Sequence, residues 1–243
     1  MSSDNNQYDI TIIGGGMVGL STLIALKPLI ISGAKIVIID PAKQTTNVDA
    51  LDSPSFDDRA TALSLGSSQF LKRIGVWHFI APFAQPIFDI EVSSYAQFGF
   101  TALNHKQAGS EAFGFIVSNK HIGQALLQVC KTINNVDYIY EQQVCELNKT
   151  HASDFPYESI LSNGQRLTAR LTLLTDGGRS KLKQKLKFKD ESFDYKKVAI
   201  VSNVQTKHPH NGKAFERFDQ HGPIALLPFH QDKLSALVWT MPT

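Results

Sequence analysis

The chain has 243 residues, of which 42% are apolar and 19% charged, and 24 Lys and Arg against 22 Asp and Glu give a net charge of +2. This length is enough for one large or two modest domains, and the apolar fraction with the low net charge excludes a disordered chain. So small a charge argues against a nucleic-acid partner, and two cysteines, Cys130 and Cys145, exclude a disulfide scaffold and a CxxC site.

The first forty residues predict a strand, a helix and a second strand. Residues 8–13 and 35–39 are short isoleucine-rich runs, which are typical of buried strands. Between them, residues 17–31 are apolar on almost every side, which predicts a buried helix that Pro28 kinks or ends. The N-terminus has no basic signal region, and no apolar stretch is long enough to span a membrane, so we expect a cytoplasmic protein.

The middle of the chain mixes a loop with helices and strands. Residues 41–58 are rich in Asp, Ser, Thr and Pro and are predicted to form a loop. The spacing of apolar residues predicts helices over 64–74 and 119–133, a half-buried strand over 87–95 and a further strand over 113–117. Since no linker separates two halves, a second domain would be interleaved with the first.

Short strands dominate the chain from residue 136 onward. Asn163-Gly164 is a strong hairpin signal, and residues 179–186 are predicted to form a helix. The strands are expected over 136–140, 143–148, 157–161, 170–174, 198–205, 214–218 and 233–240.

A GxGxxG motif, Gly14, Gly16 and Gly19, joins the first strand to the first helix. In that context the glycines allow a tight turn, close approach to a pyrophosphate and tight packing of helix on strand. The N–H groups at the helix start then face the phosphates. Asp40 follows Gly19 by 21 residues at the end of the second strand, where an acidic residue holds ribose hydroxyls. The motif predicts a bound dinucleotide but does not choose between NAD and FAD.

Two further segments carry a resemblance to a known family. Asp176-Gly177 lies in Leu-Leu-Thr-Asp-Gly-Gly-Arg-Ser, and Arg59 lies in Phe-Asp-Asp-Arg-Ala-Thr-Ala-Leu. Their order and spacing after GxGxxG resemble the flavoprotein aromatic hydroxylases. Residues 73–77 and 214–228 resemble the ubiquinone-biosynthesis branch of that family. The similarity runs from Tyr8 to Pro242, and the chain has no second GxGxxG for a nicotinamide nucleotide.

The resemblance implies an α/β fold with FAD as cofactor and NAD(P)H as co-substrate. A Rossmann-like FAD-binding domain, with a glutathione-reductase-like parallel sheet, would comprise residues 1–86 and 118–185. A mostly antiparallel β-sheet substrate domain, interleaved with it, would comprise residues 87–117 and 186–243. Both domains would be incomplete. The cofactor-binding positions implied by the resemblance are Gly14, Gly16, Gly19, Asp40, Arg59, Gln124, Asp176 and Gly177.

The implied activity is NAD(P)H- and O₂-consuming hydroxylation of a polyprenylated methoxyphenol in ubiquinone biosynthesis, with the chemistry carried by the flavin. The alternatives are a sister hydroxylase acting on another quinone precursor and a non-catalytic component of a quinone-biosynthesis assembly. Arg217 and Phe218 are expected to line the substrate cavity, although a surface charge and a core residue are the plainer interpretations. Gln124 could equally be an exposed helix residue. No catalytic residue is assigned.

The sequence departs from the family at the flavin site. Members carry a Gly-Asp-Ala-x-His motif that covers the flavin, whereas this chain has no Gly-Asp dipeptide. We therefore expect an incomplete flavin site and weak FAD binding. Position 175 is Thr where the family usually has Ala. No metal site is predicted, because the one close histidine pair, His208 and His210, lacks a nearby acidic residue and is expected in an exposed turn.

One segment is strongly basic. Lysines recur at every second position over 181–189, after Arg179, with leucines and a phenylalanine between them. The pattern fits a solvated helix end, or a peripheral contact with an anionic inner membrane that would hold a prenylated substrate. The expected partners are the polyprenylated phenol, O₂ and components of a ubiquinone-biosynthesis complex.

Overall fold

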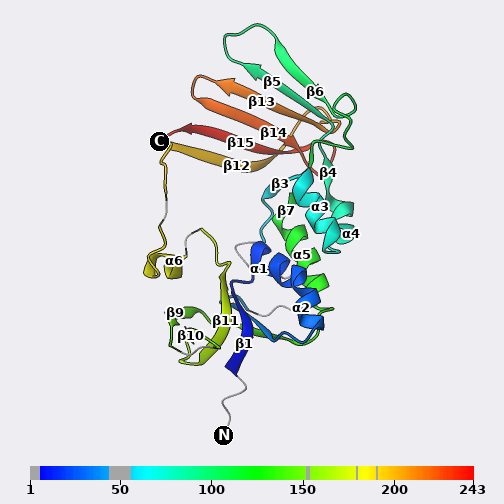
Figure 1. Cartoon of the computed structure of the whole chain (residues 1–243). Coiled ribbons are helices and arrows are strands. Elements are labelled where there is room, and N and C mark those ends of the chain that lie inside the picture. The colour runs from blue at the N-terminus through cyan, green and yellow to red at the C-terminus, as the bar shows by residue number, and fades with distance from the viewer. Residues whose placement is uncertain (1–5, 44–55, 152–153, 179, 190) are drawn as a thin grey trace. The chain divides into compact units, whose positions relative to one another are not determined.

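The computed structural model describes residues 6–43, 56–151, 154–178, 180–189 and 191–243. The chain divides into two compact units (Figure 1). Met1–Phe56 and Gly123–Asp190 form the first unit, and Asp57–Ile122 and Glu191–Thr243 form the second. The predicted FAD-binding and substrate domains have other boundaries. That assignment stays a prediction, because compactness does not identify what a unit binds.

The first unit is built on a six-stranded sheet of order β8-β2-β1-β11-β10-β9 (Figure 1). β8, β2, β1 and β11 run parallel, whereas β10 and β9 pair antiparallel. The strands are β1 Gln7–Ile13, β2 Ile36–Asp40, β8 Val136–Tyr140, β9 Val144–Lys149, β10 Tyr157–Leu161 and β11 Arg166–Leu174. All six were expected from the sequence, although β11 begins four residues before its predicted start.

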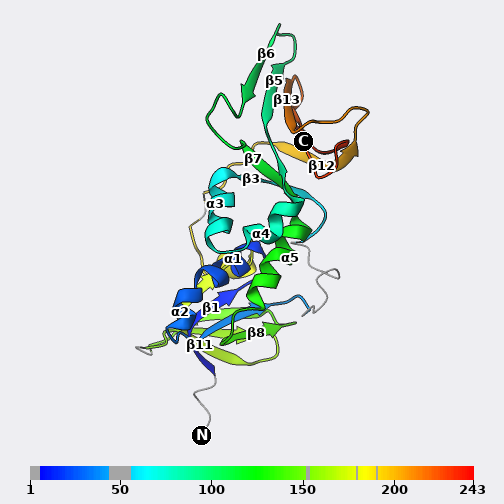
Figure 2. The same ribbon diagram turned by 90° about the vertical axis from the view of Figure 1, so that its right-hand side faces the viewer.

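The helices of the first unit pack one face against this sheet. α1 (Met17–Ala25), α2 (Lys27–Ile31) and the part of α5 (Asn119–Cys130) that belongs to this unit lie on the same side of it (Figures 1 and 2). Leu23 and Leu126 are completely buried. A fourth short helix, α6 (Lys181–Lys185), follows β11. Ile12 and Ile36 in the central strands are also fully buried, because a parallel sheet is covered on both faces.

The predicted helix over residues 17–31 is interrupted at Pro28 as expected, but its predicted burial is corrected. It is two helices, with Pro28 in the first turn of α2, where a proline lacking an N–H is tolerated. The predicted complete burial is wrong, since Val18 is 63% and Ile31 76% exposed. A helix that rests on a sheet buries one stripe, and here apolar residues continue around the outer side.

The second unit carries a six-stranded sheet of order β12-β15-β14-β13-β5-β6 (Figure 1). Its pairs are antiparallel except β13 with β5. The strands are β5 Asp89–Ser94, β6 Phe100–Asn104, β12 Lys197–Gln205, β13 Lys213–Asp219, β14 Gly222–Pro228 and β15 Leu234–Pro242. A smaller sheet pairs β3 (Ala60–Ser64) and β4 (Gln85–Pro86) with β7 (Gly114–Ser118). The helices of this unit are α3 (Leu65–Arg73), α4 (Trp77–Ile80) and the 3₁₀ turn η3 (Ala81–Phe83).

Four of these strands were not predicted from the sequence. β14 carries Pro223 and has no polar alternation, and β4 is only two residues long. β6 is exposed along most of its length, so its apolar residues show no buried face. β3 begins just after the stretch predicted as a loop, residues 41–58, of which 44–55 lie outside the described residues. The predicted helix over 64–74 and the strands over 87–95 and 113–117 are confirmed as α3, β5 and β7.

Candidate functional site

The candidate site lies at the edge of the first unit's sheet where the strand order reverses. β1 has β2 and β8 on one side and β11 on the other, and all four are parallel. Their carboxyl ends therefore meet at one edge, and the switch point falls between β1 and β11. Ligands of open α/β sheets bind in the crevice outside such a point.

The GxGxxG motif forms the turn at this edge. Gly14 has a φ of +104°, and a Cβ there would lie 2.7 Å from the Asp176 Cα and the Thr175 carbonyl oxygen. A Cβ on Gly19 would lie 1.9 Å from the Gly14 carbonyl oxygen. Both positions therefore exclude any side chain, and the motif packs β1, α1 and the end of β11 together.

The start of α1 is open to an anion. Gly16 is the N-cap, no side chain caps the helix, and its first turn contains no acidic residue. The N–H groups of the first turn have no partner within the helix, and the helix dipole is positive at this end. A phosphate at this position would accept hydrogen bonds from these N–H groups and would be attracted by the positive end of the helix dipole.

Asp40 ends β2 beside the glycine turn. Its Oδ2 accepts a hydrogen bond from the Gly15 N–H at 2.5 Å, and its Oδ1 accepts one from the Ala42 N–H at 2.8 Å. A carboxylate has about four acceptor positions, so two remain for ribose hydroxyls. The contact with Gly15 was not foreseen, because residues 25 apart in sequence meet only through the parallel pairing of β1 with β2.

Thr175 links the Asp176-Gly177 motif to the GxGxxG turn by hydrogen bonds. Its N–H donates to the Ile13 carbonyl at 2.8 Å, and its Oγ1 lies 2.8 Å from the Ile13 oxygen and 2.9 Å from the Gly14 oxygen. Thr175, which stands where the family that the sequence resembles usually has Ala, thus adds a side-chain hydrogen bond across the switch point. Gly177, with a φ of +89°, faces open space.

Two cavities of the first unit share Asp176. The smaller, of about 200 Å³, is lined by Gly14, Pro41, Asp176 and Lys181 among others and lies at the carboxyl ends of β1 and β2. The larger, of about 770 Å³, is mainly apolar and includes Val18, Leu171 and Phe188. Gly14 and Asp176-Gly177 therefore line hollowed surface, as a ligand site requires.

Gln124 lies on α5 in the first unit and is half-buried. The neighbouring Gly123 packs against Phe56, because a Cβ on Gly123 would lie 2.4 Å from the Phe56 ring. This contact, within the first unit, fixes the chain just before the Arg59 segment.

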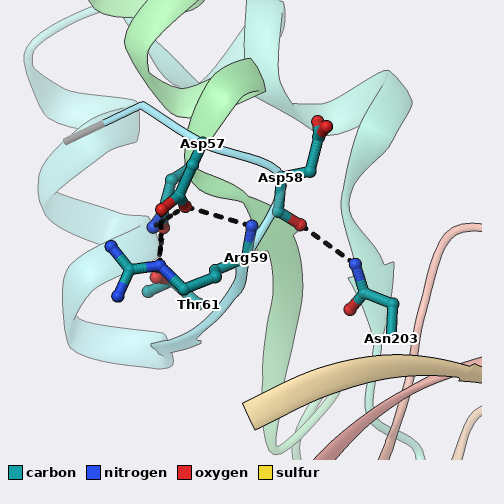
Figure 3. Close-up of polar contacts among 6 residues, drawn as sticks. Asp57, Asp58, Arg59, Thr61 and Asn203 are labelled. Atoms are coloured by element: carbon teal, nitrogen blue, oxygen red, sulfur yellow. Dashed lines mark hydrogen bonds and ion pairs between the residues drawn. The ribbon is translucent and has the colours of Figure 1, made fainter. Parts of the chain in front are cut away.

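Arg59 belongs to the second unit, where Asp57 holds it (Figure 3). Its Nε lies 2.5 Å from Asp57 Oδ2, and its backbone N–H donates to Oδ1 at 3.1 Å. Asn119 donates to the same carboxylate from its Nδ2 at 3.1 Å and accepts a hydrogen bond from Thr61 Oγ1. Asn203 bonds the Asp58 carbonyl oxygen at 3.1 Å.

The electrostatics of Asp57 follow from these contacts. Desolvation acts to raise the pKa of Asp57, but the hydrogen bonds from Arg59 and Asn119 and the Arg59 charge outweigh it and lower the pKa. The carboxylate is therefore charged at neutral pH and orients the guanidinium. Asp57 lies two residues before Arg59 in the same motif; this role was not predicted, although the spacing Asp-x-Arg could have suggested it.

Arg217 and Phe218 lie on β13 of the second unit, and both are exposed. Phe218 is 48% exposed, so the interpretation as a core residue is wrong. Adjacent residues of a strand point to opposite faces of its sheet, so the two side chains do not line one surface together. Their assignment to a substrate cavity stays a prediction.

The histidine pair is corrected in part. His208 is exposed as expected, but His210 is buried. The Gly212 N–H donates to its Nδ1 at 3.0 Å, so its Nε2 carries the proton and faces the Phe229 and Gln231 carbonyls at 2.9 and 3.0 Å. It is a structural turn residue. Within the described residues, no group of three His, Cys, Asp or Glu side chains could hold a metal ion.

Three of the curated relatives to which the chain is similar act in ubiquinone biosynthesis by their names. No protein-family model matches the chain. Ubiquinone hydroxylase UbiL of Rhodospirillum rubrum is 30% identical over 96% of this chain and 51% of its own length. Ubiquinone hydroxylase UbiM of Neisseria meningitidis is 29% identical over 97% of this chain and 50% of its own length. The zebrafish (Danio rerio) ubiquinone biosynthesis monooxygenase COQ6 is 27% identical over 98% of this chain and 50% of its own length. The chain spans about half the length of the curated relatives it matches.

Solved structures show the same fold. p-Nitrophenol 4-monooxygenase PnpA from Pseudomonas putida aligns with a TM-score of 0.76 at 17% identity, over 98% of this chain and 58% of that one. PqsL, a probable FAD-dependent monooxygenase from Pseudomonas aeruginosa, aligns with the same TM-score and identity over 98% of this chain and 61% of that one. The predicted α/β fold is thereby confirmed. In the described part of the chain, no helix has the length and apolarity to cross a membrane. The chain is thus similar, over about half of their length, to ubiquinone hydroxylases and a ubiquinone biosynthesis monooxygenase, and it has the fold of FAD-dependent monooxygenases.

Proposed function

We propose that this chain binds the adenosine-diphosphate part of FAD at the switch point between β1 and β11. The observation that carries the proposal is the junction of two glycine motifs, one after each strand, beside Asp40 and the uncapped start of α1. The diphosphate would lie on the α1 N–H groups, and Asp40 would hold the ribose. Asp176-Gly177 would approach the flavin side of the cofactor.

The residues present fit this cofactor. The positions of Gly14 and Gly19 admit no Cβ, Gly177 faces open space, and the adjoining surface is hollowed. In the second unit, Asp57 holds the Nε of Arg59, which turns the other two guanidinium nitrogens away from it (Figure 3). Arg59 and Gln124 are proposed as further cofactor residues on the family resemblance.

For the whole protein we propose NAD(P)H- and O₂-dependent hydroxylation of a polyprenylated methoxyphenol in ubiquinone biosynthesis. The relatives named above support the class of reaction. Within it, we propose 2-octaprenyl-6-methoxyphenol hydroxylase as the specific activity, on the resemblance of residues 73–77 and 214–228. When bound, the flavin would pass electrons from NAD(P)H to O₂. The part of the chain is to bind and orient the cofactor. A cytoplasmic location beside the inner membrane, with other ubiquinone-biosynthesis proteins, belongs to the same proposal.

The test is the visible spectrum and NAD(P)H oxidation of the purified chain with added FAD. Because the chain has no Gly-Asp dipeptide, we expect FAD to bind weakly and reversibly when it is added, rather than to copurify with the protein. If the protein is the proposed hydroxylase, a prenylated phenol should then stimulate NAD(P)H oxidation. Flavin binding without such stimulation would favour the non-catalytic alternative, and stimulation by a different quinone precursor would favour the sister hydroxylase. No flavin binding at any concentration would contradict the proposal itself.

A further inference from the structure

We propose that one face of the large sheet of the second unit is a dimer interface, on which a second copy of this chain packs. This surface, named here the apolar face, is formed by alternate residues of β12, β15 and β14, which are neighbours in the sheet (Figure 1). Paired residues of adjacent strands lie on the same face of a sheet, so the register assigns its members. Two of its rows are Ile200, Trp239 and Ile224, and then Ser202, Leu237 and Leu226.

The opposite face of the sheet contributes to the core of the second unit. Ala214 of β13 is buried in a hydrophobic cluster with Ile116 of β7, which belongs to the small sheet. Leu227 and Leu234, on the same face as Ala214, pack against that cluster. Helix α3 packs on β3 and β7 of the small sheet. The apolar face is therefore the side of the large sheet that is turned away from the core of its own unit.

The composition of the apolar face is that of a buried surface. The residues that β12, β15 and β14 contribute to it include no charged side chain, and two serines are its only polar side chains. Val198 is nevertheless 47% and Ile200 48% exposed. The three strands cover roughly 15 by 25 Å, close to 400 Å², a size at which an exposed apolar patch indicates an interaction site.

Charged side chains begin at the strand that borders the apolar face. On the same side of the sheet, β13 presents Lys213 and Arg217, and β5 presents Glu91, whose Oε2 lies 3.4 Å from the Lys213 Nζ. Protein interfaces have an apolar centre and a polar rim. The uncharged strands therefore fit the centre of an interface, and the charges of β13 and β5 fit its rim.

A second copy of the chain is the partner that this surface fits. Because the apolar face carries no charge, it offers no ion pair to a nucleic acid or to an acidic or basic peptide. It requires a matching apolar surface of the same size, and the same face of another copy supplies one through a twofold axis. An axis along β15 would lay β14 of each copy over β12 of the other, as in two sheets packed about 10 Å apart. The charged side chains of β13 and β5 would then stay in water outside the overlap.

The size of the apolar face sets the expected strength of the dimer. Two copies would bury roughly 800–1,000 Å² in total, which is at the low end for specific interfaces. We therefore expect a reversible dimer with a Kd of roughly 10–100 μM. The inference does not rest on the proposed function, because it involves no flavin and no residue of the first unit.

The experiment is sedimentation velocity of the 243-residue chain without FAD, from about 1 to 300 μM. The test variants, Ile200→Lys and Ser202→Lys, each place a charge on the apolar face, and Ser202 is an exposed position where a lysine can be accommodated. The matched control is Val201→Lys, on the same strand but the opposite face, at a residue that is 45% exposed. Circular dichroism shows whether each variant is folded. Acrylamide quenching of Trp239 fluorescence, in a Trp77→Phe background, reports burial of the face itself.

We expect the wild-type chain and Val201→Lys to dimerise as the concentration rises, with a parallel fall in the quenching of Trp239. Both test variants should dimerise at least about 100-fold more weakly, because an unpaired charge would be buried in the interface. A wild-type chain that stays monomeric at the highest concentration, or dimers in which the quenching of Trp239 is unchanged, would overturn the proposal. Equal effects of Ile200→Lys and Val201→Lys would also overturn it, because they would indicate pairing along the edge of β12 instead.

Discussion

The substitution Gly19→Ala tests the packing of the glycine turn. A Cβ at this position lies 1.9 Å from the Gly14 carbonyl oxygen, while ordinary contact begins at 3.4 Å, so the backbone must move by about 1.5 Å. Overpacking of this kind costs about 1–3 kcal/mol. The shift also strains the Thr175 hydroxyl contact with the same oxygen, worth about 1 kcal/mol. We expect a loss of roughly 2–4 kcal/mol from a total of about 5–15 kcal/mol.

Hydrogen exchange of the β1 and α1 amides is the suitable assay, because both tryptophans, Trp77 and Trp239, lie in the second unit and their fluorescence reports on that unit. Exchange in Gly19→Ala should be about 30- to 1,000-fold faster than in the wild type. The control is Gly178→Ala, where an added Cβ meets no atom within 4 Å, so its exchange should not change. The reasoning is refuted if Gly19→Ala exchanges within about threefold of the wild type.

Three further outcomes follow from the contacts described above. Thr175→Val removes the hydroxyl that bonds Ile13 and Gly14 and should cost about 1 kcal/mol in urea unfolding, and an unchanged midpoint would show the bond to be inert. The pKa of Asp57 lies below its usual 3.8 in the folded protein, so its ionised form stabilises the fold above that pH and the effect is lost in acid. Asp57→Asn should therefore be less stable than the wild type at neutral pH, and the deficit should shrink as the pH falls below 3.8; a deficit that is unchanged in acid would contradict this. Burial raises the pKa of Cys130 to about 12, so iodoacetamide near pH 8 should alkylate the exposed Cys145 first, and equal rates would be inconsistent with the structure.

The elements around the site could be predicted because their signals are local. An isoleucine run before Gly14 and another before Asp40 indicate two buried strands, and Pro28 indicates the break between α1 and α2. The elements that escaped depend on partners distant in sequence. β14, for example, is a strand because it lies between β13 and β15, and nothing in its own composition alternates.

The same distinction applies to the candidate site. The glycine motifs and Asp40 follow from spacing alone. The contact of Asp40 with Gly15, the Thr175 bond across the switch point and the hold of Asn119 on Asp57 join residues 25 to 162 positions apart. No sequence period reports such pairs. The exposure of Phe218 and the burial of His210 likewise depend on which face of a sheet or turn is covered.

Competition between ADP and FAD for the purified chain, followed by flavin fluorescence, tests the central claim most directly. If the switch-point turn holds the adenosine diphosphate, ADP displaces FAD, and Asp40→Ala weakens both by about tenfold or more, since a hydrogen bond to a charged group contributes about 1.5–3 kcal/mol. The control Asp219→Ala, in the second unit, leaves both affinities unchanged. FAD binding that ADP does not displace, or that survives Asp40→Ala in a folded chain, would contradict the account.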